Sequence, residues 1–205
     1  MWDIAKPDDW DGNVAIILAH GAGQGIQSPF MRFFHQALPQ RGFLSVQFNF
    51  EYIDKGRKMP DPQPKMQALY REVVQEIATT YRPRTLVIGG KSMGGRVGSY
   101  IAADSSDVRG LVFLGYPLHP PGKQDQLRDA HLYGIPQPML FLSGTRYTFA
   151  ERKLLEDVVH RIGDRATLVW TEGGDHSLKL GRASGNSTLE AAADRISAWV
   201  REGGV

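Results

Sequence analysis

Residues 85–95 read TLVIGGKSMGG, and this stretch decides how the rest of the sequence is interpreted. Residues 85–89 form an apolar run, residues 90–94 read GKSMG, and a helical pattern follows them. The pattern G-x-S-x-G between a strand and a helix is typical of a sharp turn that exposes a serine hydroxyl at the carboxyl end of a sheet. We therefore expect Ser92 to be a catalytic nucleophile.

The same turn has two other interpretations. Serine is a preferred N-cap residue, so Ser92 can instead be a residue that only caps the following helix. Residues 90–92 also match the last three positions of a phosphate-binding loop, but that loop needs a glycine five residues before Gly90, and position 85 is threonine. The phosphate-binding loop is excluded, whereas the capping interpretation stays open.

Short apolar runs alternate with helical patterns along the whole chain. The predicted strands are residues 14–19, 44–50, 85–89, 110–114, 139–142 and 167–170. Several are nearly continuous in Val, Ile, Leu and Phe, as expected when helices cover both faces of a parallel sheet. The predicted fold is therefore α/β, with a doubly wound, mostly parallel sheet and helices on both faces. No boundary divides it, so residues 1–205 are predicted to form one domain.

The composition excludes several classes of protein. The 205 residues include 24 Lys and Arg, 22 Asp and Glu, and no Cys, so disulfides, a thiol nucleophile and Cys-ligated metals are excluded. The charges form no basic stripe, so nucleic acid is not an expected partner. The acidic first residues do not have the pattern of a signal peptide, so we expect none, and the longest apolar run is too short to cross a membrane. We expect a cytoplasmic protein that needs no metal or other cofactor.

A glycine-rich loop, residues 20–25 (HGAGQG), follows the first predicted strand. A dinucleotide-binding motif starting at Gly21 would need glycine at position 26, which is isoleucine, so that interpretation fails. In a serine hydrolase this loop supplies one backbone N–H to the oxyanion hole, and the residue after the nucleophile supplies the other. The predicted donors are Ala22 or Gly23 from this loop, paired with Met93. His20 is expected to be structural.

The loop after the last predicted strand, residues 171–180 (TEGGDHSLKL), contains the candidate general base. A catalytic histidine is expected there, after the nucleophile in chain order, so His176 is the predicted base. His119 lies in a loop that opens at the same end of the sheet. We expect it to line the substrate site together with Gly23.

These motifs together resemble the α/β-hydrolase superfamily. The matching stretches are HGAG at 20–23, GKSMGG at 90–95, GYPLHPPGK at 115–123, SGTR at 143–146 and GGDH at 173–176. The chain is most similar to the small dienelactone-hydrolase-like members, including the group named for a testis-expressed protein and a subunit of the NSL histone acetyltransferase complex. The resemblance covers essentially the whole chain. It implies hydrolysis of an ester, thioester or amide by a Ser-His-acid triad.

One position departs from the family pattern. Related proteins usually carry an aspartate directly after the Gly-Thr-Arg-like run, and here that residue is Tyr147. A tyrosine is not an anion near neutral pH, although its hydroxyl can accept a hydrogen bond from His176. Glu151 is the alternative acid, and Asp125 is a second one. Lys91, next to the nucleophile, is expected to point to solvent or to pair with a carboxylate.

The sequence therefore predicts a minimal hydrolase without a cap domain, acting on a small or exposed acyl substrate. The predicted activity is that of an esterase, thioesterase or related acyl hydrolase with an atypical or missing triad acid. The alternative is a catalytically silent interaction module that has kept the fold, of which Tyr147 would be the first sign. The sequence does not indicate the oligomeric state.

Overall fold

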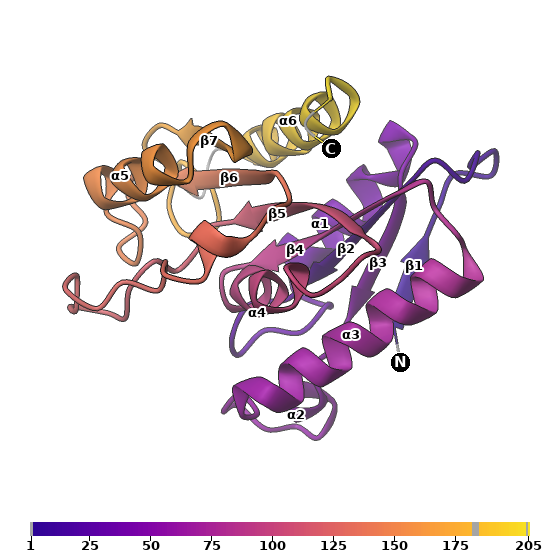
Figure 1. Ribbon diagram of the computed structural model, residues 1–205, viewed down its shortest axis with the longest axis horizontal. Coiled ribbons are helices and arrows are strands. Elements are labelled where there is room, and N and C mark those ends of the chain that lie inside the picture. Colours follow the sequence, from indigo (N-terminus) through magenta and orange to yellow (C-terminus); the bar gives the residue numbers. More distant parts are fainter. Residues whose placement is uncertain (1, 182–184, 204) are drawn as a thin grey trace.

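The computed structural model describes residues 2–181, 185–203 and 205. Its centre is a seven-stranded sheet in the order β1-β3-β2-β4-β5-β6-β7 (Figure 1). The strands are β1 (Trp2–Ala5), β2 (Val14–Ala19), β3 (Leu44–Phe48), β4 (Thr85–Lys91), β5 (Val108–Leu114), β6 (Met139–Gly144) and β7 (Ala166–Thr171). Strands β2 to β7 are parallel, and β1 alone pairs antiparallel, with β3. The predicted doubly wound, mostly parallel sheet is confirmed, and the six predicted strands are β2 to β7.

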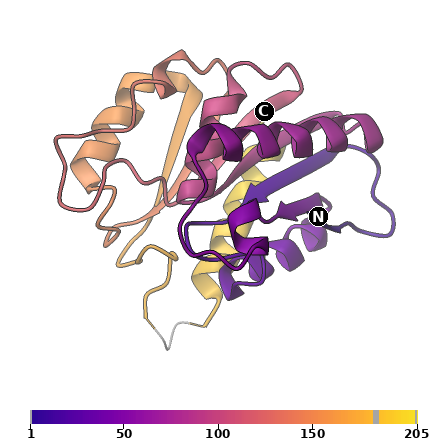
Figure 2. The same cartoon turned by 90° about the horizontal axis from the view of Figure 1, so that it is seen from below.

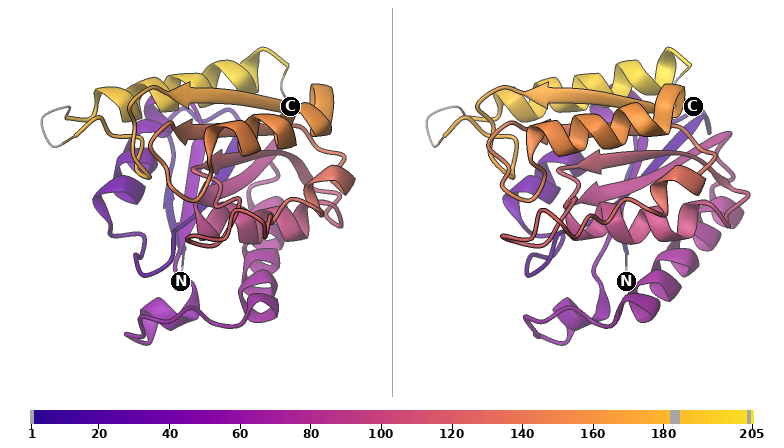
Figure 3. Two further views of the ribbon diagram at one scale, coloured as in Figure 1. Left: turned by 90° about the vertical axis from the view of Figure 1, so that its left-hand side faces the viewer. Right: turned by 60° about the vertical axis from the view of Figure 1, so that its left-hand side comes forward.

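Helices cover both faces of this sheet. They are α1 (Pro29–Ala37), α2 (Glu51–Asp54), α3 (Gln63–Thr80), α4 (Met93–Ala102), α5 (Arg152–Ile162) and α6 (Ser187–Arg201). Three short 3-10 helices join them: η1 (Pro39–Arg41), η2 (Leu132–Gly134) and η3 (Gly163–Arg165). Helices α3, α4 and α5 pack on one face, and α1 and α6 pack on the other (Figure 3).

The central strands are apolar on both faces because each face meets helices. In β2, Ala15, Ile17 and Ala19 belong to the core under α3 and α4. The alternate residues, Ile16 and Leu18, belong to the core under α1 and α6. This two-sided burial explains why the strand has no alternation of polar and apolar residues.

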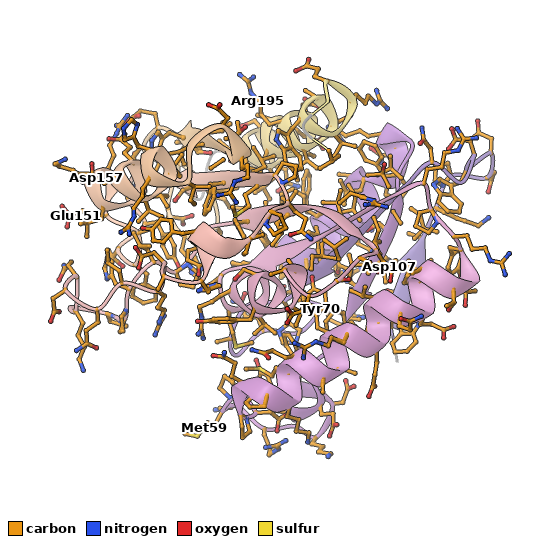
Figure 4. The ribbon with its side chains drawn as sticks, in the orientation of Figure 1. Met59, Tyr70, Asp107, Glu151, Asp157 and Arg195 are labelled. Carbon is orange, nitrogen blue, oxygen red and sulfur yellow. The ribbon has the colours of Figure 1, made fainter. Side chains whose placement is uncertain are left out.

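Tyr70 of α3 fixes the end of β4 just before the turn that carries Ser92. Helix α3 lies in the foreground of Figure 2, and Figure 4 shows Tyr70 between this helix and the sheet. The Tyr70 hydroxyl accepts a hydrogen bond from the Gly89 N–H at 3.0 Å and lies 2.6 Å from the Gly89 carbonyl oxygen. The buried phenol thus joins a surface helix to the strand that positions the site.

In the described part of the chain, no helix has the length and apolar character required to span a membrane.

Candidate active site

Ser92 occupies a strained turn between β4 and α4. Its backbone has φ 49° and ψ −112°, a conformation that non-glycine residues rarely adopt. The Ser92 N–H donates to the carbonyl of Leu114 at 3.1 Å, which ties the turn to the neighbouring strand. The side chain makes no capping hydrogen bond to α4, so the capping interpretation is wrong. Strain of about 1–3 kcal/mol persists only where the surrounding structure imposes it, and such positions cluster at functional sites.

Glycine at position 94 lets α4 approach the sheet closely enough to form this turn. A Cβ atom there would lie 2.2 Å from the carbonyl oxygen of Ala19, at the end of β2. Gly90, on the other side of Ser92, has φ 149°, and a Cβ atom there would lie 2.1 Å from the same oxygen. Both glycines are therefore required by backbone contacts.

The structure brings Ser92, Tyr147 and His176 together. The rings of Tyr147 and His176 stack with an interplanar angle of 3° and centroids 4.4 Å apart. The Tyr147 hydroxyl lies 3.3 Å from the Ser92 hydroxyl, within hydrogen-bonding distance. One tyrosine side chain therefore contacts both the candidate nucleophile and the candidate base. Its hydroxyl meets the serine and its ring face covers the imidazole.

Burial sets the protonation of both aromatic side chains. It lowers the pKa of His176 to about 4, with the nearby Lys91 charge acting in the same direction and Asp175 opposing it. Burial also raises the pKa of Tyr147 to about 12. At neutral pH the imidazole is therefore uncharged and able to accept a proton, and Tyr147 is a neutral phenol. The Nε2 atom of His176 is buried and has no hydrogen-bond partner among the described residues.

The carboxylates near His176 are placed in ways that limit a triad role. Asp175 Oδ1 accepts the backbone N–H groups of Ser177 at 2.7 Å and Lys179 at 3.0 Å, so it holds the loop together. Glu151 is exposed at the start of α5, and Figure 4 shows it at the outer edge of the molecule. Asp125 is exposed in the loop before η2. The described residues contain no hydrogen bond or ion pair between His176 and a carboxylate.

Lys91 is buried, and the expectation that it points to solvent or pairs with a carboxylate is wrong. Its side chain is 4% exposed, and Nζ donates to the Ser177 hydroxyl at 2.9 Å. Nζ also lies 4.4 Å from the centre of the Phe30 ring. Burial lowers the pKa of Lys91 to about 8. Lys91 thus places a positive charge near His176, and it is hydrogen-bonded to Ser177, the residue after His176.

The loop after β2 is held by aromatic side chains and by His20. The Gly23 N–H donates to the Tyr52 hydroxyl at 3.1 Å and is thereby occupied. His20 Nε2 accepts the Phe50 N–H at 3.1 Å, so Nδ1 carries the proton and donates to the Gly21 carbonyl at 2.8 Å. Both nitrogens of His20 serve the backbone, which is a structural role. With Gly23 occupied, Ala22 is the better placed of the two residues predicted to donate from this loop.

A pocket of about 340 Å³ opens beside Ser92. Its walls include Ala22, Gln63, Met93, Arg96, Arg128 and Phe149. The volume lies at the small end of the range for ligand pockets. Neither Gly23 nor His119 is on its walls: His119 is fully buried, with Nδ1 2.9 Å from the Pro120 carbonyl oxygen. Pro117 and Pro121, each two positions away from His119 in the sequence, line the pocket instead.

The two arginines of this pocket were not predicted from the sequence. Arg96 is four residues after Ser92, so helical periodicity alone could have placed it one turn above the nucleophile. Arg128 lies in the irregular segment between β5 and η2, where no periodic signal exists. Its position depends on tertiary hydrogen bonds, such as the Arg128 N–H donated to Leu118 at 2.7 Å.

Comparisons with known proteins identify the family and the fold of the chain. A family model described as an alpha/beta hydrolase domain matches residues 12–201. A dienelactone hydrolase from Anabaena variabilis is 18% identical, with a TM-score of 0.77 over 98% of this chain and 90% of that one. An alpha-beta serine hydrolase homologue from Coxiella burnetii is 18% identical, with a TM-score of 0.76 over 96% and 89%. A serine hydrolase without lid from Xanthomonas campestris is also 18% identical, with a TM-score of 0.72 over 98% and 88%. At this identity, the solved structures demonstrate a shared fold.

Proposed function

The chain belongs to the alpha/beta hydrolase domain family, and we propose that it is a serine hydrolase that cleaves esters or thioesters. Ser92 is the proposed nucleophile, His176 the general base, and the backbone N–H groups of Ala22 and Met93 the oxyanion hole. The observation that carries the proposal is the strained Ser92 at the mouth of a pocket, in contact with a phenol that covers a neutral imidazole.

In the first half of the reaction, the Ser92 oxygen attacks the carbonyl carbon while His176 takes the hydroxyl proton. The carbonyl oxygen becomes an oxyanion and accepts the N–H groups of Ala22 and Met93. The tetrahedral intermediate collapses, the bond to the leaving group breaks, and His176 returns its proton to the departing oxygen or sulfur. The product is an acyl ester on Ser92.

In the second half, water attacks the acyl ester and gives a proton to His176. The intermediate collapses, the acid product leaves, and Ser92 regains its proton. Tyr147 has a positioning role in this scheme: its hydroxyl orients the Ser92 hydroxyl, and its ring fixes the plane of the imidazole. Its neutral phenol does not supply the anionic charge with which a triad acid stabilises the imidazolium. We therefore expect slow turnover relative to hydrolases with a complete triad.

Labelling with a fluorophosphonate probe tests the nucleophile directly. The unmodified protein is expected to react with one equivalent of probe, and Ser92→Ala is expected to lose the label. Ser106→Ala, an exposed serine in the turn after α4, is the matched control and should label normally. Labelling that persists in Ser92→Ala would contradict the assignment.

His176→Ala tests the base in the same assay. This variant lacks the proposed base for the Ser92 proton, so the rate of labelling and of ester hydrolysis should fall by roughly 10³-fold or more. A circular dichroism spectrum and melting temperature close to those of the unmodified protein would show that the loss is chemical. If the unmodified protein neither labels nor hydrolyses esters, the silent interaction module becomes the better explanation.

A further inference from the structure

Two guanidinium groups line the pocket beside Ser92 without forming an ion pair. Arg96 comes from the first turns of α4 and Arg128 from the segment before η2. Neither takes part in a salt bridge within the described part of the chain. A guanidinium group at a protein surface usually forms hydrogen bonds with a carboxylate or with water, whereas these two line the same pocket.

Arg96 is held in place but keeps unused hydrogen-bonding capacity. One terminal nitrogen lies 3.5 Å from the Gln63 side-chain oxygen, a long contact. Its Nε atom is buried and has no hydrogen-bond partner among the described residues. A buried donor left without a partner costs about 1–3 kcal/mol, so this arrangement favours an acceptor supplied from outside the chain.

The acidic groups around the pocket are already engaged elsewhere. Asp61 also lines it, but its Oδ1 pairs with Arg57 at 2.7 Å and lies 3.8 Å from Lys65. Asp129, the neighbour of Arg128, accepts the Tyr133 hydroxyl at 2.5 Å. Among the described residues, no carboxylate is therefore paired with either guanidinium group. Burial and, to a smaller extent, the Arg96 charge lower the pKa of Arg128.

We propose that Arg96 and Arg128 bind an anionic group of the substrate, so that the preferred substrate is an ester or thioester carrying a carboxylate or a phosphate. Guanidinium groups suit both anions because their planar donors can form paired hydrogen bonds. Arg96 follows Ser92 by four residues, a rise of about 6 Å along the helix. A short acyl chain is therefore long enough to join the reacting carbonyl to the anion. This inference rests on the proposed function.

The first test compares two esters that differ only in charge. One is the p-nitrophenyl monoester of glutaric acid, which keeps a free carboxylate, and the other is its methyl-capped form. The unmodified protein should have a kcat/KM about tenfold or more higher for the free acid. Arg128→Gln and Arg96→Gln should each reduce this preference about tenfold, and Arg128→Lys should restore part of it. Arg109→Gln, an exposed arginine near the opposite end of β5, should leave the preference unchanged.

The outcomes separate this inference from the proposed function. Hydrolysis of the capped ester with no preference for the free acid would overturn the inference and leave the hydrolase standing. If neither ester is hydrolysed and Ser92 is not labelled, anion binding by the two arginines can still be tested without any hydrolase activity. Isothermal titration calorimetry with glutarate and with inorganic phosphate measures it. Binding that Arg128→Gln removes and Arg109→Gln retains supports it, and the tighter of the two ligands identifies the anion. Absence of binding by both ligands overturns it.

Discussion

The turn after β4 and the loop after β6 lie at the same edge of the sheet, but they contribute to the candidate site in different ways. Around Ser92, backbone contacts permit only glycine at positions 90 and 94, so the geometry of the turn is fixed by the main chain. After β6 the main chain is also fixed, since the Arg146 N–H donates to Gly174 at 2.9 Å. At position 147, by contrast, the contact with Ser92 and His176 is made by the side chain, which here is a buried tyrosine.

The difference shows that a site can keep its scaffold while one chemical group changes. A substitution in the turn after β4 disturbs the packing of a helix on the sheet. A substitution at position 147 changes what touches His176 and Ser92 but leaves the loop hydrogen bonds in place. Substitutions in the turn after β4 are thus expected to change mainly the free energy of unfolding, and substitutions at position 147 mainly the rate of the reaction.

The largest effect is expected for Gly94→Ala. The new Cβ atom would lie 2.2 Å from the Ala19 carbonyl oxygen, so α4 and β2 must move apart. We expect the free energy of unfolding to fall by about 3 kcal/mol, the cost of forcing an extra carbon into a packed contact. Urea denaturation followed by circular dichroism measures it.

Gly134→Ala is the matched control for this change. Position 134 ends η2, and a Cβ atom there would have no neighbour within 4 Å, so its stability should be nearly unchanged. Equal stability of the two alanine variants would show that the packing at Ala19 can relax. The claim that the main chain fixes the turn would then fail.

A smaller, chemical effect is expected for Tyr147→Asp. The carboxylate would stand beside the imidazolium that forms during catalysis and stabilise it. We expect esterase activity on a p-nitrophenyl ester to rise about tenfold above that of the unmodified protein, since a triad acid contributes up to about 10⁴ when its geometry is ideal. Tyr147→Asn has a similar size and no charge, so it separates the charge from the loss of the ring.

Equal rates for the aspartate and asparagine variants would contradict this prediction. Glu151→Ala identifies the other possible acid. Because Glu151 is exposed and forms no hydrogen bond or ion pair with His176 among the described residues, this variant should keep its activity. A large loss in Glu151→Ala would transfer the acid role to that residue.

Most of the fold could be predicted because a parallel sheet covered on both faces leaves continuous apolar runs in the sequence. Strand β1 was missed because it is four residues long, only partly buried and paired with β3 at the edge of the sheet. Its formation depends on a partner more than 40 residues away in the chain, at Trp2 and Phe48 for example. Local patterns carry no information on such a pairing.

The candidate site was predictable where it depends on local backbone geometry and unpredictable where it depends on tertiary packing. Ser92 follows from a strand, a glycine-flanked turn and a helix, all within one short segment. The buried position of Lys91 and the stacking of Tyr147 on His176 depend on loops that are distant in sequence. The pocket position of Arg128 has the same origin.

The smallest expected effect is a shift in the pH dependence of the reaction. His176 must be neutral to accept the Ser92 proton, and burial, aided by the Lys91 charge, lowers its pKa to about 4. Activity should therefore rise with pH through about 4 and be constant near pH 7. The same lowered pKa makes folding less favourable as the pH falls from about 6.5 toward 4, because the unfolded chain takes up the proton first.

Lys91→Met removes the charge and keeps a side chain of similar length over the Phe30 ring. Without the positive charge, protonation of His176 becomes easier, so the acid limb of kcat/KM should move to higher pH by a fraction of a pH unit. Ser177→Ala is the control, because it removes the hydrogen bond to Lys91 and keeps the charge. A limb that moves equally in both variants would show that the hydrogen bond, and not the charge, controls His176. An acid limb well above pH 7 in the unmodified protein would show that an anion does lie beside His176, and Tyr147 would then not mark a broken triad.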